Sequence, residues 1–184
     1  MGVFNLIRSD YRKYRLYGGS ALGIVLLTQG FWAIFQYRFA HRIHQISFKP
    51  LRILLAVPML LWQKVIEIST GISIPASAKI GHSFYIGHFG GIILNAEARL
   101  GNNCNISQGV TIGVSGIGDN RGVPVIGDNV FIGVNSVVAG KITIGNDVLI
   151  GSCSMVKDSL PDLAVAMGVP AVIVSMNGSK AYLK

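Results

Sequence analysis

His88 is the single ionisable side chain in an otherwise apolar segment, IGHFGGI, which runs from Ile86 to Ile92. An imidazole gains and loses a proton near neutral pH, so it is well suited to act as a general base towards a hydroxyl group. A lone histidine in apolar company is more often a satisfied core residue. The choice between these two interpretations depends on the elements that position His88.

A six-residue repeat of aliphatic residues surrounds this histidine and runs through most of the chain after residue 71. β-Branched residues occupy every sixth position at Ile126, Ile132, Val138, Ile144, Ile150 and Val156. The same spacing occurs upstream at Leu94, Leu100, Ile106 and Ile112, with a companion row at Ile80, Ile86, Ile92, Ala98, Cys104 and Val110. Six-residue steps indicate short strands joined by tight corners, three to a triangular coil, with the aliphatic rows inside. The repeat therefore predicts a mainly β fold, a parallel β-helix of about four to five coils.

The position of His88 in this repeat predicts that it points outwards. It lies two residues after Ile86 and four before Ile92, both of which belong to an inward row. The repeat slips once, between Ile112 and Ile126, and we expect an extruded loop at 113–125. Loops on a rigid scaffold often carry function, although a plain tolerated insertion is the alternative. Backbone N–H groups near Gly113, where the strand ends, are candidate donors to an oxyanion.

Charge and hydropathy divide the chain into three parts. Residues 1–71 hold nine Lys and Arg against two Asp and Glu, whereas residues 72–184 hold seven against six. We expect a basic, apolar helical segment at 1–71, a β-helix domain at 72–174 and a C-terminal tail at 175–184. The uncharged stretch 16–37 is long enough to span a bilayer, but its glycines and the TQG sequence predict two or three packed helices instead. Such a segment packs on partner chains or lies peripherally on an anionic membrane; its scattered basic residues do not predict nucleic-acid binding.

The segment from Ser77 to Gly113, SAKIGHSFYIGHFGGIILNAEARLGNNCNISQGVTIG, resembles the central coils of the serine acetyltransferase family. Gln29–His41 and Gly168–Ala171 also resemble that family, so the similarity covers most of residues 29–174. It implies a left-handed β-helix, acetyl-CoA as the co-substrate, and His88 as the general base. It further implies a homotrimer or dimer of trimers, with the site between two subunits. The positions that the resemblance assigns to coenzyme A are Gly113, Val114, Val134, Ala139, Ser152, Gly168, Pro170 and Ala171.

Three departures from the family pattern bear on the acceptor. The family's aspartate that orients the base corresponds to Ser73, the aspartate before the base to Gly87, and a second active-site histidine to Val123. These losses predict a hydroxyl acceptor on a sugar or on a lipid-linked polysaccharide precursor, as in polysaccharide O-acetyltransferases. We expect Asp119 and Arg121 to contact this acceptor. Hydrogen bonds that orient the imidazole are expected from Asn95, Asn105, Ser107 or Gln108. A serine acceptor and a non-catalytic β-helix scaffold are the alternatives.

Few residues are of a type that binds metals or forms disulfides. The two cysteines, Cys104 and Cys153, are too few for a disulfide framework, and no cleavable signal peptide is evident, so we expect a cytoplasmic protein. A γ-type carbonic anhydrase shares the β-helix but binds zinc through three histidines, and the repeat holds only His82 and His88. The sequence therefore predicts no metal.

Overall fold

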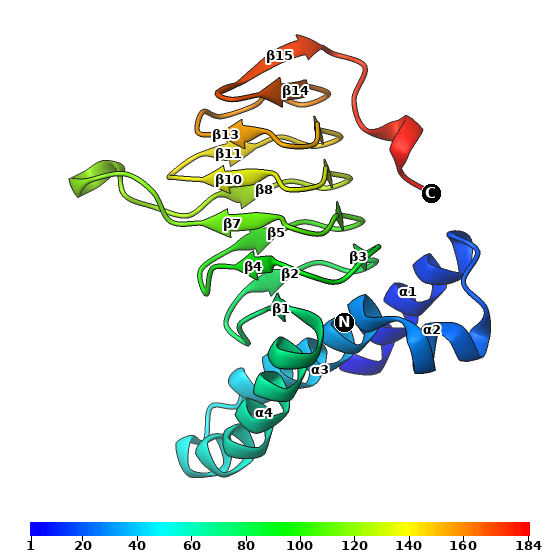
Figure 1. Cartoon of the computed structure of the whole chain (residues 1–184). Helices are drawn as coiled ribbons and strands as arrows, with labels where there is room; N and C mark the ends of the chain where they lie inside the picture. Colours follow the sequence, from blue (N-terminus) through cyan, green and yellow to red (C-terminus); the bar gives the residue numbers. More distant parts are fainter.

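A computed structural model describes all residues, 1–184. The chain begins with four helices that lie below a left-handed β-helix (Figure 1). They are α1 (Val3–Leu16), α2 (Ala21–Leu27), α3 (Gln29–His44) and α4 (Lys49–Thr70). We expected two or three helices in this segment, and the structure has four. Pro58 does not interrupt α4, which is one helix of 22 residues. None of the four helices is long and apolar enough to cross a membrane.

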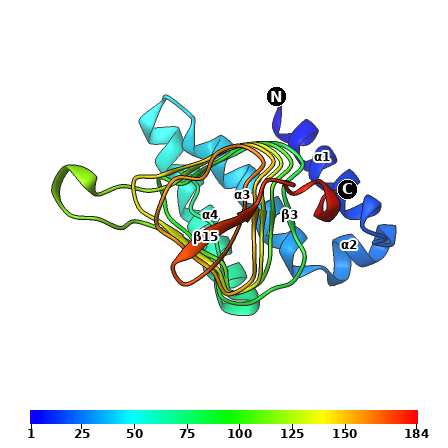
Figure 2. The same cartoon turned by 90° about the horizontal axis from the view of Figure 1, so that it is seen from above.

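Short strands stack into the three flat faces of the β-helix, which superimpose when viewed from above (Figure 2). Sheet A contains β1 (Ile72–Ser73), β4 (Ile92–Leu94), β7 (Thr111–Gly113), β10 (Val137–Ala139) and β13 (Met155–Val156). Sheet B contains β2 (Lys79–Ile80), β5 (Arg99–Leu100), β8 (Val125–Ile126) and β11 (Thr143–Ile144). Sheet C contains β3 (Tyr85–Ile86), β6 (Asn105–Ile106), β9 (Phe131–Ile132), β12 (Leu149–Ile150), β14 (Val165–Gly168) and β15 (Ala171–Ser175).

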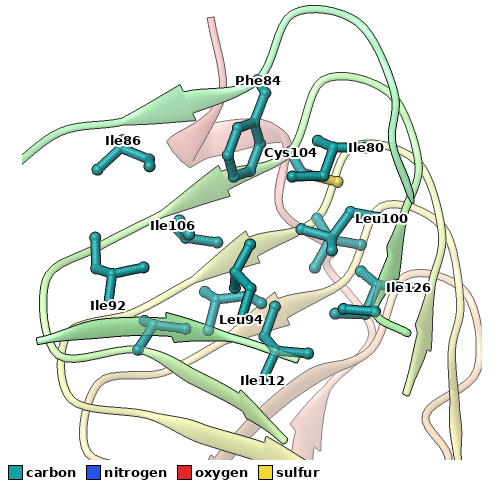
Figure 3. Close-up of a cluster of buried hydrophobic side chains, with 14 of the residues drawn as sticks. Ile80, Phe84, Ile86, Ile92, Leu94, Leu100, Cys104, Ile106, Ile112 and Ile126 are labelled. Atoms are coloured by element: carbon teal, nitrogen blue, oxygen red, sulfur yellow. The ribbon is translucent and has the colours of Figure 1, made fainter. Parts of the chain in front are cut away.

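The aliphatic rows of the repeat fill the interior of the coils (Figure 3). Ile86, Ile106 and Ile132 lie one above another in sheet C, and each is at most 1% exposed. Complete burial of an isoleucine side chain contributes roughly 1.5–3 kcal/mol, so the stacked rows are a main source of the β-helix's stability. At the upper end of the stack, β15 pairs antiparallel with β14 and closes sheet C.

The turn that carries His88 contains two residues more than the equivalent turns. Ile86 pairs with Ile106, and Leu94 pairs with Ile112, so eight residues in the first coil correspond to six in the second. The repeat therefore slips twice, and our expectation of a single slip was wrong. Gly90, with φ of 101°, supplies a backbone conformation that accommodates the extra residues.

The helices complete the first coil, whose outer edge has no further coil to pair with. Strands β1, β2 and β3 end their sheets, and their free N–H and C=O groups need partners. Helical side chains supply partners for several of these groups. Tyr14 Oη donates to Ile86 O at 2.8 Å and accepts from Ile86 N at 3.2 Å. Tyr37 Oη likewise donates to Ala78 O at 2.8 Å and accepts from Ile80 N at 3.2 Å.

A buried ion pair between α1 and α3 continues this set of contacts. Arg38 donates through Nε to Asp10 Oδ2 at 2.8 Å, and both side chains are at most 1% exposed. The same guanidinium donates to the carbonyl oxygens of Ile80 at 2.8 Å and Gly81 at 2.7 Å. Asp10 accepts from the backbone N–H of Phe84 at 2.9 Å. The pair thus fastens two helices to strands β2 and β3.

Replacement of the guanidinium tests this anchoring. Arg38→Met leaves the Asp10 carboxylate buried without its partner, and we expect the free energy of unfolding to fall by about 3–5 kcal/mol. Urea denaturation followed by circular dichroism measures it. Arg42→Met, an exposed position of the same helix, should change stability by no more than about 0.5 kcal/mol. Equal effects of the two substitutions would contradict the anchoring role.

Lys13 gives a second, pH-dependent prediction. Burial lowers its pKa from 10.5 to about 8. Between these two values the folded chain binds fewer protons than the unfolded chain, so this residue makes the free energy of unfolding increase with pH. The contribution of Lys13 to the free energy of unfolding is lost as the pH falls through about 8. Urea titrations from pH 7.5 upwards should show a steeper rise for wild type than for Lys13→Met, and parallel curves would contradict the prediction.

Candidate active site

His88 lies in the turn between β3 and β4, where sheet C meets sheet A, and its side chain is exposed. The turn rests on the end of α4. Gly90 N donates to Thr70 O at 2.8 Å, and Ile92 N donates to Gly71 O at 3.0 Å. A side chain at Gly71 would place its Cβ 3.1 Å from Gly91 N, so the contact is a close approach of backbones. The helix end and the turn are therefore held as one unit.

Several residues that the sequence associated with coenzyme A lie along the same edge as His88. The turns that follow the strands of sheet C are equivalent from coil to coil. Gln108, Val134 and Ser152 therefore occupy the position two residues after the buried isoleucine of each strand, as His88 does. Gly168 continues this line, because Ala166 pairs with Ile150 and Gly168 N donates to Ser154 Oγ at 3.1 Å. Pro170 and Ala171 follow in the β14–β15 hairpin. We call this the His88 edge.

The remaining predicted site residues lie at the junction of sheets A and B, which we call the loop edge. Gly113 and Ala139 pair in register at the ends of β7 and β10. Residues 114–124 leave the β-helix there as a long projection (Figure 2), which includes the short 3-10 helix η1 (Gly118–Asn120). Its base is closed by two hydrogen bonds between the backbones of Ser115 and Gly122, and Lys141 Nζ donates to Asp119 O at 3.0 Å.

A shallow groove runs beneath this projection. Its lining includes Asn95, Glu97, Val114, Arg121 and Val123. The side chains of Asp119 and Arg121 are exposed. Sheet A separates this groove from the His88 edge, so one chain does not bring Arg121 or the Gly113–Val114 N–H groups to His88.

Two of the four residues expected to orient the imidazole do not share its edge. Asn95 turns the chain at the loop edge, where its Oδ1 accepts from Glu97 N at 2.9 Å. Asn105 lies within β6, and its Nδ2 donates to Tyr17 Oη at 2.7 Å. Ser107 and Gln108 both lie in the turn after β6, on the His88 edge, and the Oε1 of Gln108 is buried without a hydrogen-bond partner in the chain.

The structure also reveals a carboxylate that the sequence did not single out. Ser73 Oγ donates to Glu67 Oε1 at 2.8 Å, and Glu67 also accepts from Gln63 and Lys64. Burial opposes ionisation of Glu67, but these hydrogen bonds outweigh it and lower the pKa of the carboxyl group. A signal existed in the sequence, because Glu67 is one of only two acidic residues in the basic segment 1–71.

The cysteines do not form a second reactive centre, and the chain offers no evident metal site. Cys104 is buried, and burial raises the pKa of its thiol to about 11, so it is a small core residue. Cys153 is exposed. No group of three or more His, Cys, Asp or Glu side chains within the chain is placed to hold a metal ion.

Comparison with known proteins defines the class. A model of the bacterial transferase hexapeptide (six repeats) matches residues 124–158. Serine acetyltransferase of Bacillus subtilis (strain 168) is 33% identical over 157 residues, which are 85% of this chain and 69% of that protein. A solved serine acetyltransferase in complex with cysteine superimposes with a TM-score of 0.80 at 30% identity, over 94% of this chain and 70% of that one. Another in complex with CoA gives a TM-score of 0.80 at 29% identity and the same coverage.

The fold and these similarities define a hexapeptide-repeat acyltransferase. More narrowly, the chain belongs to the serine acetyltransferase family. Our expectation of a sugar or polysaccharide acceptor was therefore wrong, because the relatives are serine acetyltransferases across most of the chain. That expectation rested on the replacements at Ser73, Gly87 and Val123. These three positions carry less weight than a similarity to serine acetyltransferases that covers the helices as well as the β-helix.

The exposed thiol gives a test of the His88 edge. Cys153 directly follows Ser152 in the same turn, whereas Cys104 is buried, so a maleimide should modify one site. We expect modification of Cys153 to abolish most binding of coenzyme A, and bound coenzyme A to slow the modification. Calorimetry before and after labelling measures this, with Cys153→Ala as the unreactive control. Unchanged binding by the labelled protein would place the cofactor elsewhere.

Proposed function

We propose that the chain is a serine O-acetyltransferase, which transfers the acetyl group of acetyl-CoA to the hydroxyl of serine with His88 as general base. The observation that carries the proposal is the similarity to serine acetyltransferases over 85% of the chain. The position of His88 on an exposed turn, together with the lining of its edge, supports it.

The proposed reaction needs a base and donors to an oxyanion. His88 accepts the proton of the serine hydroxyl while the oxygen attacks the thioester carbon. Backbone N–H groups at Gly113 and Val114 stabilise the negative charge of the tetrahedral intermediate. Collapse of the intermediate breaks the carbon–sulfur bond, and the leaving thiolate takes the proton from the imidazolium. The thioester is already activated, so the residues named here account for the whole sequence of steps.

The separation of the two edges supports a shared site in a homotrimer or dimer of trimers. A complete constellation requires the His88 edge of one protomer and the loop edge of another. The chain also has an apolar face without a partner on α4, which a further protomer would cover. Its exposed members are Ile53, Leu54, Val57, Leu60, Leu61, Val65 and Ile68.

In this proposal, serine is bound by residues other than the aspartates and the histidine that this chain replaces with Ser73, Gly87 and Val123. Arg121 is the proposed partner of the serine carboxylate, because its guanidinium is exposed and lines the groove beneath the projection. Val123, in the same groove, supplies an apolar wall.

Activity of single variants tests the proposed base. Release of coenzyme A should depend on L-serine, and His88→Ala should lower kcat by about 10²–10⁴-fold. His82→Ala is the matched control, because that exposed histidine lies in the β2–β3 turn at a different edge; it should retain wild-type activity. Full activity of His88→Ala, or release that does not depend on serine, would contradict the proposal.

Mixed oligomers test the shared site. Two differently tagged variants, His88→Ala and Arg121→Glu, are each expected to have little activity alone. Co-expression and tandem purification should give oligomers that regain activity, because some sites combine an intact His88 with an intact loop. No regain in oligomers shown by mass spectrometry to be mixed would place the whole site within one protomer.

The expectation that residues 1–71 contact an anionic membrane stays a prediction. Co-sedimentation with anionic liposomes at low salt checks it, and absence of binding would contradict it.

A further inference from the structure

We propose that Glu67, acting through the hydroxyl of Ser73, is the positioning residue that orients the imidazole of His88. This inference rests on the proposed role of His88 as general base. It adds a carboxylate from α4, supplied by the helical segment rather than by the β-helix itself.

The first argument is the place of Glu67 beside the catalytic turn. Glu67 lies in the last turn of α4, and the carbonyl oxygen of Thr70, in the same turn, accepts from Gly90 N at 2.8 Å. Ser73 lies in β1 and pairs with Ile93 in β4, the strand that the His88 turn enters. Figure 1 shows the end of α4 leading directly into β1 below β4. The carboxylate, the hydroxyl and the turn therefore belong to one packed unit.

The second argument is that the other seven acidic residues of the chain lie elsewhere. Asp10 is buried in its ion pair with Arg38. Three acidic residues belong to the loop edge or its projection: Glu97, Asp119 and Asp158. Three more lie where sheet B meets sheet C and hold the turns of successive coils together: Asp128, Asp147 and Asp162. Glu67 is thus the one carboxylate available to His88 within the chain.

The hydrogen-bond direction gives the third argument. Ser73 Oγ donates its proton to Glu67 Oε1, so its lone pairs remain available to accept from the Nδ1–H of the ring. That bond would leave Nε2 without a proton and free to accept one from the substrate. When the ring becomes an imidazolium, the carboxylate stabilises the positive charge through the polarised hydroxyl. No proton leaves Ser73 in this arrangement, and no additional reactant is needed.

The carboxylate is well prepared for this role. Its side chain is 18% exposed and therefore lies largely out of water. Lys64 donates to Oε2, and Gln63 donates to Oε1, the oxygen that Ser73 also uses; both bonds help to keep the carboxylate ionised, consistent with its lowered pKa.

Gln108 is the rival partner for the ring. It occupies the same edge as His88, and its buried Oε1 is unpartnered. A neutral amide oxygen orients a ring but supplies no negative charge. The two partners therefore predict different pH dependence, and the experiment separates them.

The test combines kinetics with a readout that needs no acceptor. The tautomer of His88 in the free protein is read from its ring nitrogens by nuclear magnetic resonance in wild type, Glu67→Gln, Ser73→Ala and Gln108→Leu. We expect the Nδ1–H form in wild type and a mixture of tautomers in Glu67→Gln and Ser73→Ala. In kinetics with serine, both variants should lose about 10–100-fold in kcat/KM, and the acid limb of the pH profile should move to lower pH.

Rescue and a matched control complete the design. Ser73→Asp in the Glu67→Gln background places a carboxylate directly at the ring and should restore kcat/KM and the position of the acid limb. Asp162→Asn, at an exposed position where sheet B meets sheet C, keeps the side-chain oxygen that accepts from Asn146 N and should change neither.

The tautomer measurement separates failure of this inference from failure of the proposed function. A wild-type Nδ1–H tautomer that is unchanged in Glu67→Gln and Ser73→Ala would overturn the inference, as would a change confined to Gln108→Leu. A tautomer shift in these two variants, combined with no turnover of serine by wild type, would support the positioning role and contradict the serine acceptor.

Discussion

The open edge of the first coil is the constraint on which the rest of the structure depends. A parallel β-helix must begin somewhere, and its first strands present backbone groups that no further coil can pair. Here the helical segment supplies the missing partners through Tyr14, Tyr37, and the Asp10–Arg38 pair. The helices are therefore a structural part of the β-helix and not an appendage to it.

This constraint also fixes the active site, because the proposed base belongs to the first coil. The turn of His88 is two residues longer than the equivalent turns of the coils above it, and it folds over the end of α4. A catalytic turn at the end of a solenoid is held in place by the element that closes that end. In this chain the closing element also brings Glu67 and Ser73 to the turn. Anchoring of the helices and orientation of the base are thus two consequences of one interface.

The sequence was sufficient to predict the coils but not their closure. Strict spacing of aliphatic residues reports a local constraint, because each inward position is repeated by its neighbours; the interior rows and the extruded loop followed from it. The second slip was hidden because Ile86 and Ile92 keep the six-residue interval while the register shifts between them. The Asp10–Arg38 contacts join residues up to 74 positions apart, and no periodic pattern marks such pairs. The site was predicted in part. The turn of His88 was recognisable, whereas Glu67, which accepts a hydrogen bond from Ser73, lies in a helix six residues earlier and was not singled out.

The identity of the product tests the central claim most directly. Wild-type protein would be incubated with L-serine and acetyl-CoA labelled with ¹³C in the acetyl group, and the products followed by nuclear magnetic resonance. Serine O-acetyltransferase activity predicts that the label passes to the serine oxygen as O-acetylserine in step with the loss of acetyl-CoA. Labelled acetate alone, or acetyl-CoA that persists while its binding is demonstrated, would contradict the account.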